Sequence, residues 1–372
     1  MNLGNVYDRG IIRGITKYVH SNGRWQLYVE EDPADKLSVF TAWSGEGLIV
    51  DLDDRRIAKA IPQFAGKVVG IGCLAPQVLR TLDISTVKTD DQMIAEWAAD
   101  HLAEKGLEHF AYCGMRLRGL DQWDAVRRES FCRRILRHGQ ECSVFTGRQH
   151  LSQHWGSMLK ELTEWLEKLP KPVGLMACND SQGRYVLEGC RQLDIRVPQD
   201  VAVIGVDNDE LMCELAIPPL SSIAQHTEQI GFRAAQLLDE LMAGRQRRCV
   251  HLTVSPACVV TRQSSDIVAL DDEVVSRAIE FIRDHSTELL GVPEIAHQVG
   301  VSQSTLEKRF KALLGHTVHD ELQKRRLDIA RRLLTSSKLS LQVIAERSGF
   351  RSAHYMSAVF QREFGYPPGK LR

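Results

Sequence analysis

Carboxylate, amide, guanidinium and indole groups occur at four places in the first part of the chain where they could hold a polar ligand. These places are residues 7–9, 89–91 and 123–128, and the pair of segments 178–180 and 205–208. Carboxylate and guanidinium groups can bridge adjacent hydroxyls through charge-assisted hydrogen bonds, and an indole face can cover the C–H side of a sugar. The candidate ligand-binding residues are Asp8, Asp90, Trp123, Arg127, Asn179, Asp180 and Asp207.

The spacing of apolar runs predicts the frame that would bring these groups together. The expected strands are residues 25–30, 47–51, 67–72, 109–114, 142–146, 173–178 and 201–207. The expected helices between them are residues 92–105, 125–137, 157–169, 182–193 and 229–242. Strands that are apolar throughout and separated by helices indicate parallel sheets covered on both faces. We therefore expect two α/β lobes, with a ligand beyond the carboxyl ends of their strands.

Two of the candidate residues have an alternative interpretation. Asp is favoured in turns and at helix N-termini, so Asp180 and Asp207 could serve the backbone instead of a ligand. Their types and spacing alone leave both interpretations open.

The last hundred residues carry one pattern twice. Ile295-Ala296, three residues, then Gly300 and an apolar residue recur 49 positions later, from Ile344-Ala345 to Gly349. A glycine can take the left-handed conformation that a tight turn between two helices needs, and Ser302 can cap the helix that follows. Both copies therefore predict a helix-turn-helix.

The second helix of each copy has an apolar stripe and a polar face. Leu306, Phe310, Leu313 and Leu314 form the first stripe, and Met356, Phe360 and Phe364 form the second. The opposite faces are polar or basic, as a helix that enters a major groove requires. The predicted DNA-contacting residues are Gln303, Ser304, Lys308, Lys311, Arg351 and His354.

A basic helix is expected to connect the two copies. Residues 318–334 read as one helix of about 26 Å, which could place two recognition helices in successive major grooves about 34 Å apart. From Ser286 to the end the chain has 14 Lys and Arg against 8 Asp and Glu, a net charge of +6, whereas the whole chain has −1. The alternative is a plain helical bundle with solvated charges.

Composition narrows the class of protein. The 372 residues suit two or three domains, and no run of about 18 apolar residues or signal-like start occurs. The nine cysteines form no CxxC pair, so we expect reduced thiols, no metal site and a cytoplasmic protein without a cofactor. Because no GxSxG, HExxH, GxxxxGK[ST] or GxGxxG pattern occurs, catalytic residues are not expected. A plain solute-binding protein would not need the last hundred residues.

Residues 274–372 resemble the AraC-type DNA-binding domain. The resemblance rests on residues 306–311 (LEKRFK), 325–334 (RRLDIARRLL), 344–345 (IA) and 348–350 (SGF), with Tyr355 and Phe360. The closing Pro367-Pro368 and Leu371-Arg372 also match, although Leu371 stands where the family has Tyr. The resemblance implies a regulator that binds double-stranded operator DNA.

Residues 1–262 resemble the LacI-type sensor, which has the two-lobed fold of periplasmic sugar-binding proteins. The matching segments are residues 87–90 (VKTD), 101–106 (HLAEKG), 177–180 (ACND), 203–207 (VIGVD) and 218–223 (PPLSSI). By motif, Arg127, Asn179 and Asp207 fall on sugar-contacting positions of that family, and so does Asp90. The family begins with a strand for which residues 1–6 are too short, so we expect that strand to be missing and a sheet edge to be open.

The two resemblances together predict a sugar-controlled regulator. They divide the chain into a sensor (1–262), a linker (263–270) and an all-α DNA-binding domain (271–372) with two helix-turn-helix motifs. This pairing resembles activators of xylose catabolic genes, which implies D-xylose as ligand, RNA polymerase as a partner, a homodimer and no membrane association. A regulator of the same architecture that senses a different sugar or acts as a repressor is the alternative.

Overall fold

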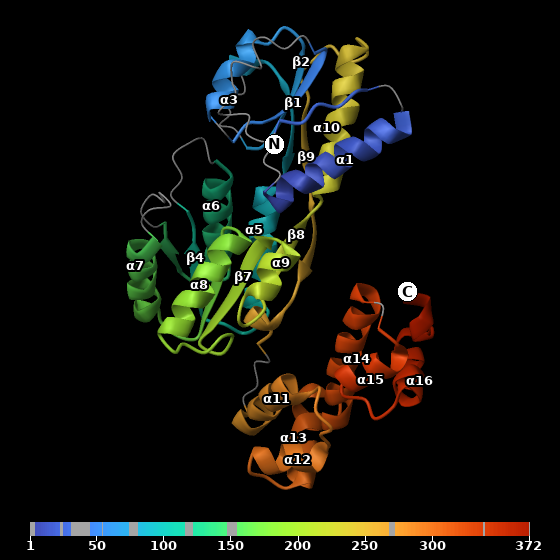
Figure 1. Ribbon diagram of the computed structural model, residues 1–372. Coiled ribbons are helices and arrows are strands. Elements are labelled where there is room, and N and C mark those ends of the chain that lie inside the picture. Colours follow the sequence, from blue (N-terminus) through green and yellow to red (C-terminus); the bar gives the residue numbers. More distant parts are fainter. Residues whose placement is uncertain are drawn as a thin grey trace. The chain divides into compact units, whose positions relative to one another are not determined.

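The computed structural model describes residues 4–22, 25–30, 45–53, 55–73, 81–115, 122–146, 155–267, 272–337 and 339–371. The chain divides into two compact units, Met1–Ile267 and Val268–Arg372. The first is α/β and the second is helical (Figure 1). This confirms the predicted architecture. No described helix is long and apolar enough to cross a membrane.

The first lobe of unit 1 is built on a four-stranded parallel sheet. Its order is β1-β2-β3-β9, with bounds β1 Gly47–Asp51, β2 Lys67–Ile71, β3 Ser85–Thr89 and β9 His251–Val254. Helices α1 (Val6–Asn22) and α10 (Thr227–Met242) cover one face, and α3 (Arg55–Ala60) and the 3-10 helix Ile61–Gln63 cover the other (Figure 1). A Cβ at Gly231 of α10 would lie 1.9 Å from the carbonyl oxygen of Ile11 in α1, so only glycine permits this approach.

The second lobe contains a six-stranded sheet of order β10-β8-β7-β6-β4-β5, in which only the β10–β8 pair is antiparallel. Its strands are β4 His109–Cys113, β5 Cys142–Phe145, β6 Val173–Ala177, β7 Val201–Asp207, β8 Ser221–Gln225 and β10 Pro256–Val260. Its helices are α5 Asp91–Ala103, α6 Gln122–Arg137, α7 Trp155–Lys168, α8 Asp180–Gln192 and α9 Glu210–Leu215. One core lies between the sheet and α5 and α6, and another lies between the opposite face and α7 and α8.

The chain passes between the lobes at three adjacent places. β3 leads into α5, β8 leads into α10, and β9 leads into β10. The amide of Asp90 donates to the carbonyl of Val254 over 2.9 Å, and β8 pairs with β10. These contacts hold the crossing segments together beside the strand ends of both sheets.

Two sets of strand predictions differ from the structure. Residues 25–30 form no strand, because no described strand pairs with them, and Leu27, Tyr28 and Val29 are exposed. Strands β3, β8, β9 and β10 were not predicted. Most positions of β9 and β10 are exposed or half-buried, so they form no apolar run. In β3 and β8, serine and threonine occupy buried positions and break the apolar run. These residues are Ser85, Thr86, Thr89, Ser221 and Ser222.

The boundary between the units lies after Ile267. Gln263–Ser265 form a 3-10 helix, and Ser264 and Ser265 are fully buried in unit 1. The first five residues that we expected in the linker are therefore packed against the sensor. The remaining three, 268–270, lie outside the described residues.

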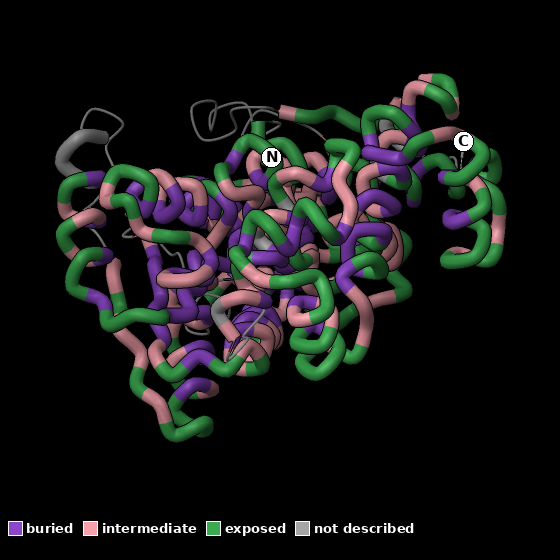
Figure 2. The backbone as a smooth tube through the Cα atoms, turned by 90° about the horizontal axis from the view of Figure 1, so that it is seen from below, coloured by how far each residue is buried: buried purple, intermediate pink, exposed green. Residues whose placement is uncertain are grey.

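Unit 2 consists of six helices and a final 3-10 turn over its described residues. They are α11 Glu273–His285, α12 Val292–Gln298, α13 Gln303–Leu314, α14 Val318–Ser336, α15 Leu341–Arg347, α16 Ala353–Phe364 and the turn Pro368–Leu371. One core joins α11, α12 and α13, and a second joins α14, α15 and α16. Buried and exposed positions alternate along these helices (Figure 2).

The predicted apolar stripes are buried at four of their seven positions, and Leu314 and Phe364 are partly buried. Leu306 and Phe310 on α13 and Met356 and Phe360 on α16 are fully buried. Leu313 is 42% exposed, because it lies at the edge of the stripe near the end of α13. The connecting helix α14 has 19 residues and ends two positions later than predicted.

Candidate functional sites

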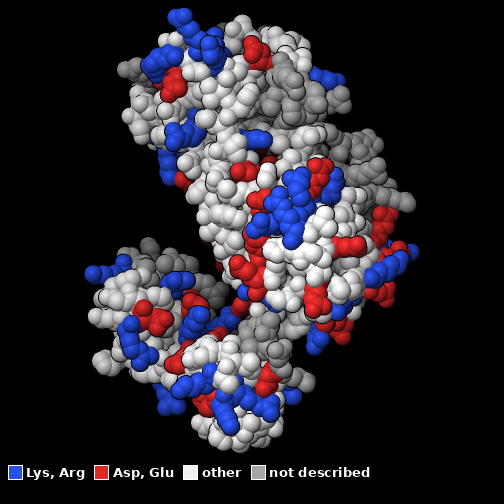
Figure 3. Space-filling view, turned by 180° about the vertical axis from the view of Figure 1, so that it is seen from behind, with Lys and Arg blue, Asp and Glu red and all other residues white. Residues whose placement is uncertain are grey.

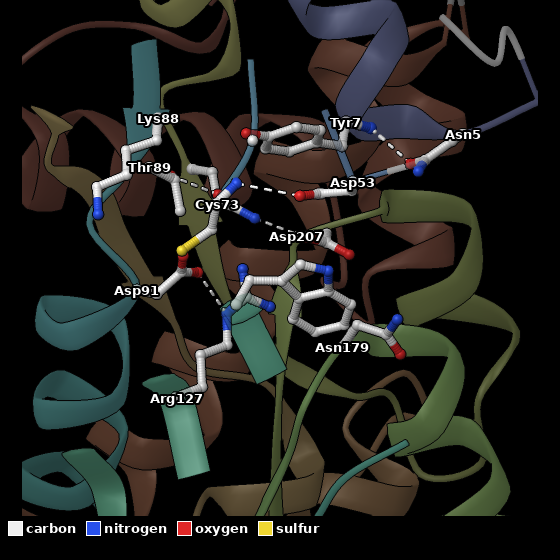
Figure 4. Close-up of a pocket in the computed structure, with 13 residues that line it drawn as sticks. Asn5, Tyr7, Asp53, Cys73, Lys88, Thr89, Asp91, Arg127, Asn179 and Asp207 are labelled. Atoms are coloured by element: carbon white, nitrogen blue, oxygen red, sulfur yellow. Dashed lines mark hydrogen bonds and ion pairs between the residues drawn. The ribbon is translucent and has the colours of Figure 1, made fainter. Parts of the chain in front are cut away.

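A pocket lies where the carboxyl ends of strands from both sheets of unit 1 meet (Figure 4). Its volume is about 540 Å³, with the open solvent at its mouth included. The residues that line it are Asn5, Tyr7, Asp53, Gly72, Cys73, Lys88, Thr89, Asp91, Trp123, Arg127, Asn179, Asp207 and Gln225.

A buried ion pair fixes the guanidinium in this pocket. The Nε of Arg127 donates to Oδ1 of Asp91 over 2.8 Å, and one terminal nitrogen donates to the carbonyl of Cys178 over 2.7 Å. The side chains of Arg127 and Asp91 are 5% and 4% exposed. The indole of Trp123 lies 4.8 Å from the guanidinium carbon. Arg127 is therefore oriented by the protein before any ligand binds.

Electrostatics keep this guanidinium charged. Burial alone would lower the pKa of Arg127, but the carboxylates of Asp91 and Asp207 raise it above its ordinary value. Burial raises the pKa of Asp91, and Arg127 opposes that rise. We take the ionised pair as the working state, because its geometry is that of a charge-assisted hydrogen bond.

One glutamine connects the two lobes at the back of the pocket. The hydroxyl of Thr89, on β3, donates to Oε1 of Gln225 over 2.6 Å. Nε2 of Gln225 donates to Oδ1 of Asp207, at the end of β7, over 2.6 Å. Burial raises the pKa of Asp207, although Arg127 and Gln225 act against the rise.

The first lobe contributes a backbone-lined wall. Gly72 follows β2 with φ of +109°, and a Cβ there would lie 2.6 Å from Oδ1 of Asp53. The amide of Cys73 donates to that same oxygen over 3.0 Å. Burial raises the pKa of the Tyr7 hydroxyl, so this group is protonated and can act as a donor.

Four of the seven predicted ligand residues line the pocket, namely Trp123, Arg127, Asn179 and Asp207. The other three do not. The side chain of Asp90 accepts from the amide of Met93 and caps α5, and Asp8 is buried in α1. Asp180 accepts from the hydroxyl of Ser222 over 2.6 Å and the amide of Asp209 over 2.8 Å, which is the turn-supporting role that the sequence left open.

Several lining residues were missed although their segments were identified. Tyr7 lies beside the predicted Asp8, and Thr89 and Asp91 lie on either side of the predicted Asp90. Asp53, Gly72, Cys73 and Lys88 follow or end strands of the first lobe, and Gln225 ends β8. Position at the end of a strand was the signal that could have found them.

The two helix-turn-helix units of the second unit are built alike. Gly300 and Gly349, both with φ of +77°, make the turns that precede α13 and α16. The hydroxyls of Ser302 and Ser352 accept from the amides three residues later and cap these helices. All six predicted DNA-contacting residues are exposed: Gln303, Ser304, Lys308, Lys311, Arg351 and His354. On the face shown in Figure 3, Lys and Arg lie in several patches over this unit.

A buried arginine joins the two helix-turn-helix units. Nε of Arg326, on α14, donates to the carbonyl of Ser286 over 2.8 Å, and one terminal nitrogen donates to the carbonyls of Glu288 and Leu290. Gly349 packs on the same place, because a Cβ there would lie 2.3 Å from the Ser286 oxygen. The turn of the second unit thus rests directly on the loop that enters the first.

The whole chain matches known regulators. Residues 1–92 match the XylR N-terminal domain, 99–265 a periplasmic binding protein-like domain and 295–372 a helix-turn-helix domain. The xylose operon regulatory protein of Escherichia coli (strain K12) is 32% identical over 372 residues, which cover 100% of this chain and 95% of that protein. This chain belongs to the family of xylose operon regulatory proteins. The Haemophilus influenzae member is 30% identical and covers 100% and 96%.

Solved structures agree with this family. A structure of the xylose-binding transcription activator xylR matches with a TM-score of 0.79 and 31% identity, covering 100% of this chain and 96% of that one. A LacI family regulator from Enterococcus faecium with bound ribose covers 71% of this chain and 96% of its own, with a TM-score of 0.56 and 19% identity, which shows the fold alone. As a member of the family, the chain is a DNA-binding transcription regulator and not an enzyme, as predicted.

The buried ion pair leads to a stability prediction. Replacing Arg127→Met leaves the Asp91 carboxylate buried without its partner, which typically costs about 3–5 kcal/mol. Burial raises the pKa of Asp91, so the native variant binds a proton more readily than the unfolded chain. Stability should therefore rise as the pH falls, and urea unfolding should show a larger loss at pH 8 than at pH 5.

The control lies on the same helix. Arg134 makes a bidentate pair with Asp100 in which both side chains are 33% exposed. Because solvent screens such a pair, Arg134→Met should cost much less stability than Arg127→Met. Equal losses for the two variants would contradict the assigned role of the buried pair.

The packing of Gly349 gives a second prediction with a matched control. Gly300→Ala and Gly349→Ala carry the same left-handed strain, about 1–2 kcal/mol, but the Cβ meets nothing within 4 Å at Gly300 and meets Ser286 at Gly349. We expect Gly349→Ala to be the less stable variant in urea unfolding of the full chain, by about a further 1–3 kcal/mol. Equal stabilities would show that this contact is not tight.

Proposed function

We propose that this protein binds a pentose, D-xylose, in the pocket and controls the transcription of xylose catabolic genes as an activator. The observation that carries the proposal is the pocket itself, in which Arg127, Asn179, Asp207 and an indole converge at the strand ends of both lobes. Carboxylate and guanidinium groups suit paired hydroxyls. Alignment along the full chain with xylose operon regulators favours xylose among the sugars.

The proposed ligand contacts are made by Trp123, Arg127, Asn179 and Asp207. Asp180 supports the turn that presents Asp207, and Asp90 caps the helix that presents Asp91. Asp8 lies beside Tyr7 in the first turn of α1 and is buried there, so it is not among the proposed contacts.

We also propose that α13 and α16 enter successive major grooves of a double-stranded operator. Lys308 lies on the polar face of α13, and Arg351 lies in the turn that precedes α16. Helix α14 with Arg326 keeps the two helices in one arrangement. The regulator would act in the cytoplasm as a homodimer that contacts RNA polymerase. The alternative within the same architecture is a sensor of a different sugar or a repressor.

The test of the sugar proposal is a thermal-shift screen of the full chain with D-xylose, other pentoses and hexoses. A specific ligand stabilises the folded state by linkage, about 2.7 kcal/mol at a hundredfold excess over Kd, so D-xylose should raise Tm the most. Stabilisation by another sugar alone would favour the alternative, and the absence of any shift would refute the proposal.

A comparison of two aspartate variants tests whether the sugar binds in this pocket. Asp207→Asn should weaken xylose binding, whereas Asp194→Asn should not, since Asp194 also has a positive φ but is exposed and outside the pocket. Because burial raises the pKa of Asp207, lowering the pH from 8 to 5 protonates this acceptor. The wild-type affinity, measured by calorimetry, should fall over that range more than that of Asp207→Asn.

The DNA proposal is tested by changing one residue in each helix-turn-helix unit, Lys308 on α13 and Arg351 in the turn before α16. We expect Lys308→Ala and Arg351→Ala each to weaken operator binding, by about 1–3 kcal/mol and at specific base positions if the side chain contacts a base. Lys160→Ala, which removes an exposed lysine from α7 of the sensor, is the control. Unchanged affinity at both sites in a gel-shift assay would show that other faces contact the DNA.

A further inference from the structure

The last described residues of unit 1, 262–267, form what we call the exit segment, because unit 2 begins at Val268. Buried serines fix this segment on the second sheet. The hydroxyl of Ser264 donates to the carbonyl of Val203, on β7, over 2.6 Å. The same hydroxyl accepts from the amide of Ser221, on β8, over 2.8 Å. The exit segment is therefore anchored to β7 at Val203 and to β8 at its first residue.

Arg262 begins the exit segment and reaches toward the pocket. Its amide donates to the hydroxyl of Ser221 over 2.7 Å, and that hydroxyl donates to the Arg262 carbonyl over 2.8 Å. Its guanidinium donates to the carbonyl of Leu220 over 3.0 Å and to Oδ1 of Asn208 over 2.8 Å. The partner Asn208 directly follows Asp207, which lines the pocket.

The turn that joins these two residues has an unusual backbone. Asp207 has φ of +107° and Asn208 has φ of +51°, values that are uncommon for residues with a side chain, although Asn and Asp adopt a positive φ more often than most. Hydrogen bonds to β8 and α8 hold this turn. The amide of Asn208 donates to the hydroxyl of Ser222, and that hydroxyl donates to the carboxylate of Asp180. A strained turn of this kind at a binding site is suited to two alternative arrangements.

A second connection reaches the exit segment from another wall of the pocket. Helix α5 begins at Asp91, the partner of Arg127, and carries His101 in its last turn. Nε2 of His101 lies 2.7 Å from the hydroxyl of Ser265. Two elements that line the pocket thus each contact the exit segment.

We propose that the Asn208–Arg262 hydrogen bond transmits sugar occupancy at Asp207 to the exit segment, and through it to the affinity of unit 2 for DNA. The inference rests on the proposed function, since it assigns the regulation of the same site. A sugar that contacts Asp207 stabilises one arrangement of the strained turn. Asn208 passes that preference to Arg262, the first residue of the segment that leads to the DNA-binding unit. Binding at one site then changes affinity at the other by differential stability of two states.

A merely structural role for Arg262 predicts different results. Loss of structural support lowers Tm and alters sugar affinity and DNA affinity separately. Loss of the relay leaves both affinities near their wild-type values and removes the factor by which saturating sugar changes operator affinity. That factor is the readout, and for coupled sites it is typically about 5- to 150-fold.

The experiment measures operator affinity of the full-length protein by fluorescence anisotropy, with and without saturating D-xylose, and sugar affinity by calorimetry. Arg262→Met keeps the stem and removes the donors. Asn208→Gly removes the acceptor and suits the positive φ, so it serves if Arg262→Met fails to fold. Asn208→Asp keeps an acceptor, and Arg245→Met, which removes an exposed arginine paired with Asp239, is the matched control.

We expect the coupling factor to fall below about twofold in Arg262→Met and Asn208→Gly, and to stay at its wild-type size in Asn208→Asp and Arg245→Met. The double variant of Asn208→Gly and Arg262→Met should lose no more than either single variant, because both remove one interaction. Wild-type coupling retained in both single variants would overturn the relay while leaving the sugar sensor intact. The proposed function and the relay are both overturned if the wild-type protein binds no pentose, or if bound sugar leaves its operator affinity unchanged.

Discussion

The buried pair of Arg127 and Asp91 is the constraint on which the sensor depends. Each charge alone would cost several kcal/mol to remove from water, so the two must be buried together. Arg127 belongs to α6 of the second lobe, whereas Asp91 begins α5 two residues after Thr89, which ends β3 of the first lobe. The pair therefore fixes α6 at the place where the chain crosses between lobes. Thr89, Gln225 and Asp207 meet at that same place.

The same pair prepares the pocket for a ligand. Because Asp91 and the carbonyl of Cys178 already hold the guanidinium, binding a sugar does not have to order this long side chain. Ordering such a side chain would cost about 0.5–1.5 kcal/mol. The indole of Trp123 is placed by the same guanidinium, over which it stacks. The polar and aromatic parts of the site are thus positioned by one interaction.

Pattern alone predicted the segments of this site but not always the residue within them. Apolar runs located six of the ten described strands, whereas β3, β8, β9 and β10 were missed. In β3 and β8 the buried positions include Ser85, Ser221 and Ser222. These hydroxyls bind Arg262, Asp180 and the backbone, which is a reason that exists only in the folded state. At the start of α5 the sequence offers two adjacent carboxylates. Only the position of the helix start decides that Asp90 caps the helix and Asp91 meets Arg127. The helix-turn-helix units were easier to predict, because the same pattern occurs twice. Each copy also depends on local features, a glycine at the turn and a serine that caps the next helix.

Both units contain turns with left-handed backbone, but glycine makes them in the DNA-binding unit and Asp207 and Asn208 make one in the sensor. In the DNA-binding unit the turns need only a sharp change of direction, and at Gly349 a side chain would strike the carbonyl of Ser286. Glycine adopts this conformation without strain. In the sensor the turn after β7 has Asp207 and Asn208 with positive φ, and strain of about 1–3 kcal/mol for each residue is expected there. Glycine would remove that strain, but it would also remove the carboxylate that faces the pocket and the amide that accepts from Arg262. The strain is tolerated because both side chains at this turn have a partner, and the buried carboxylate of Asp180 holds the turn in place.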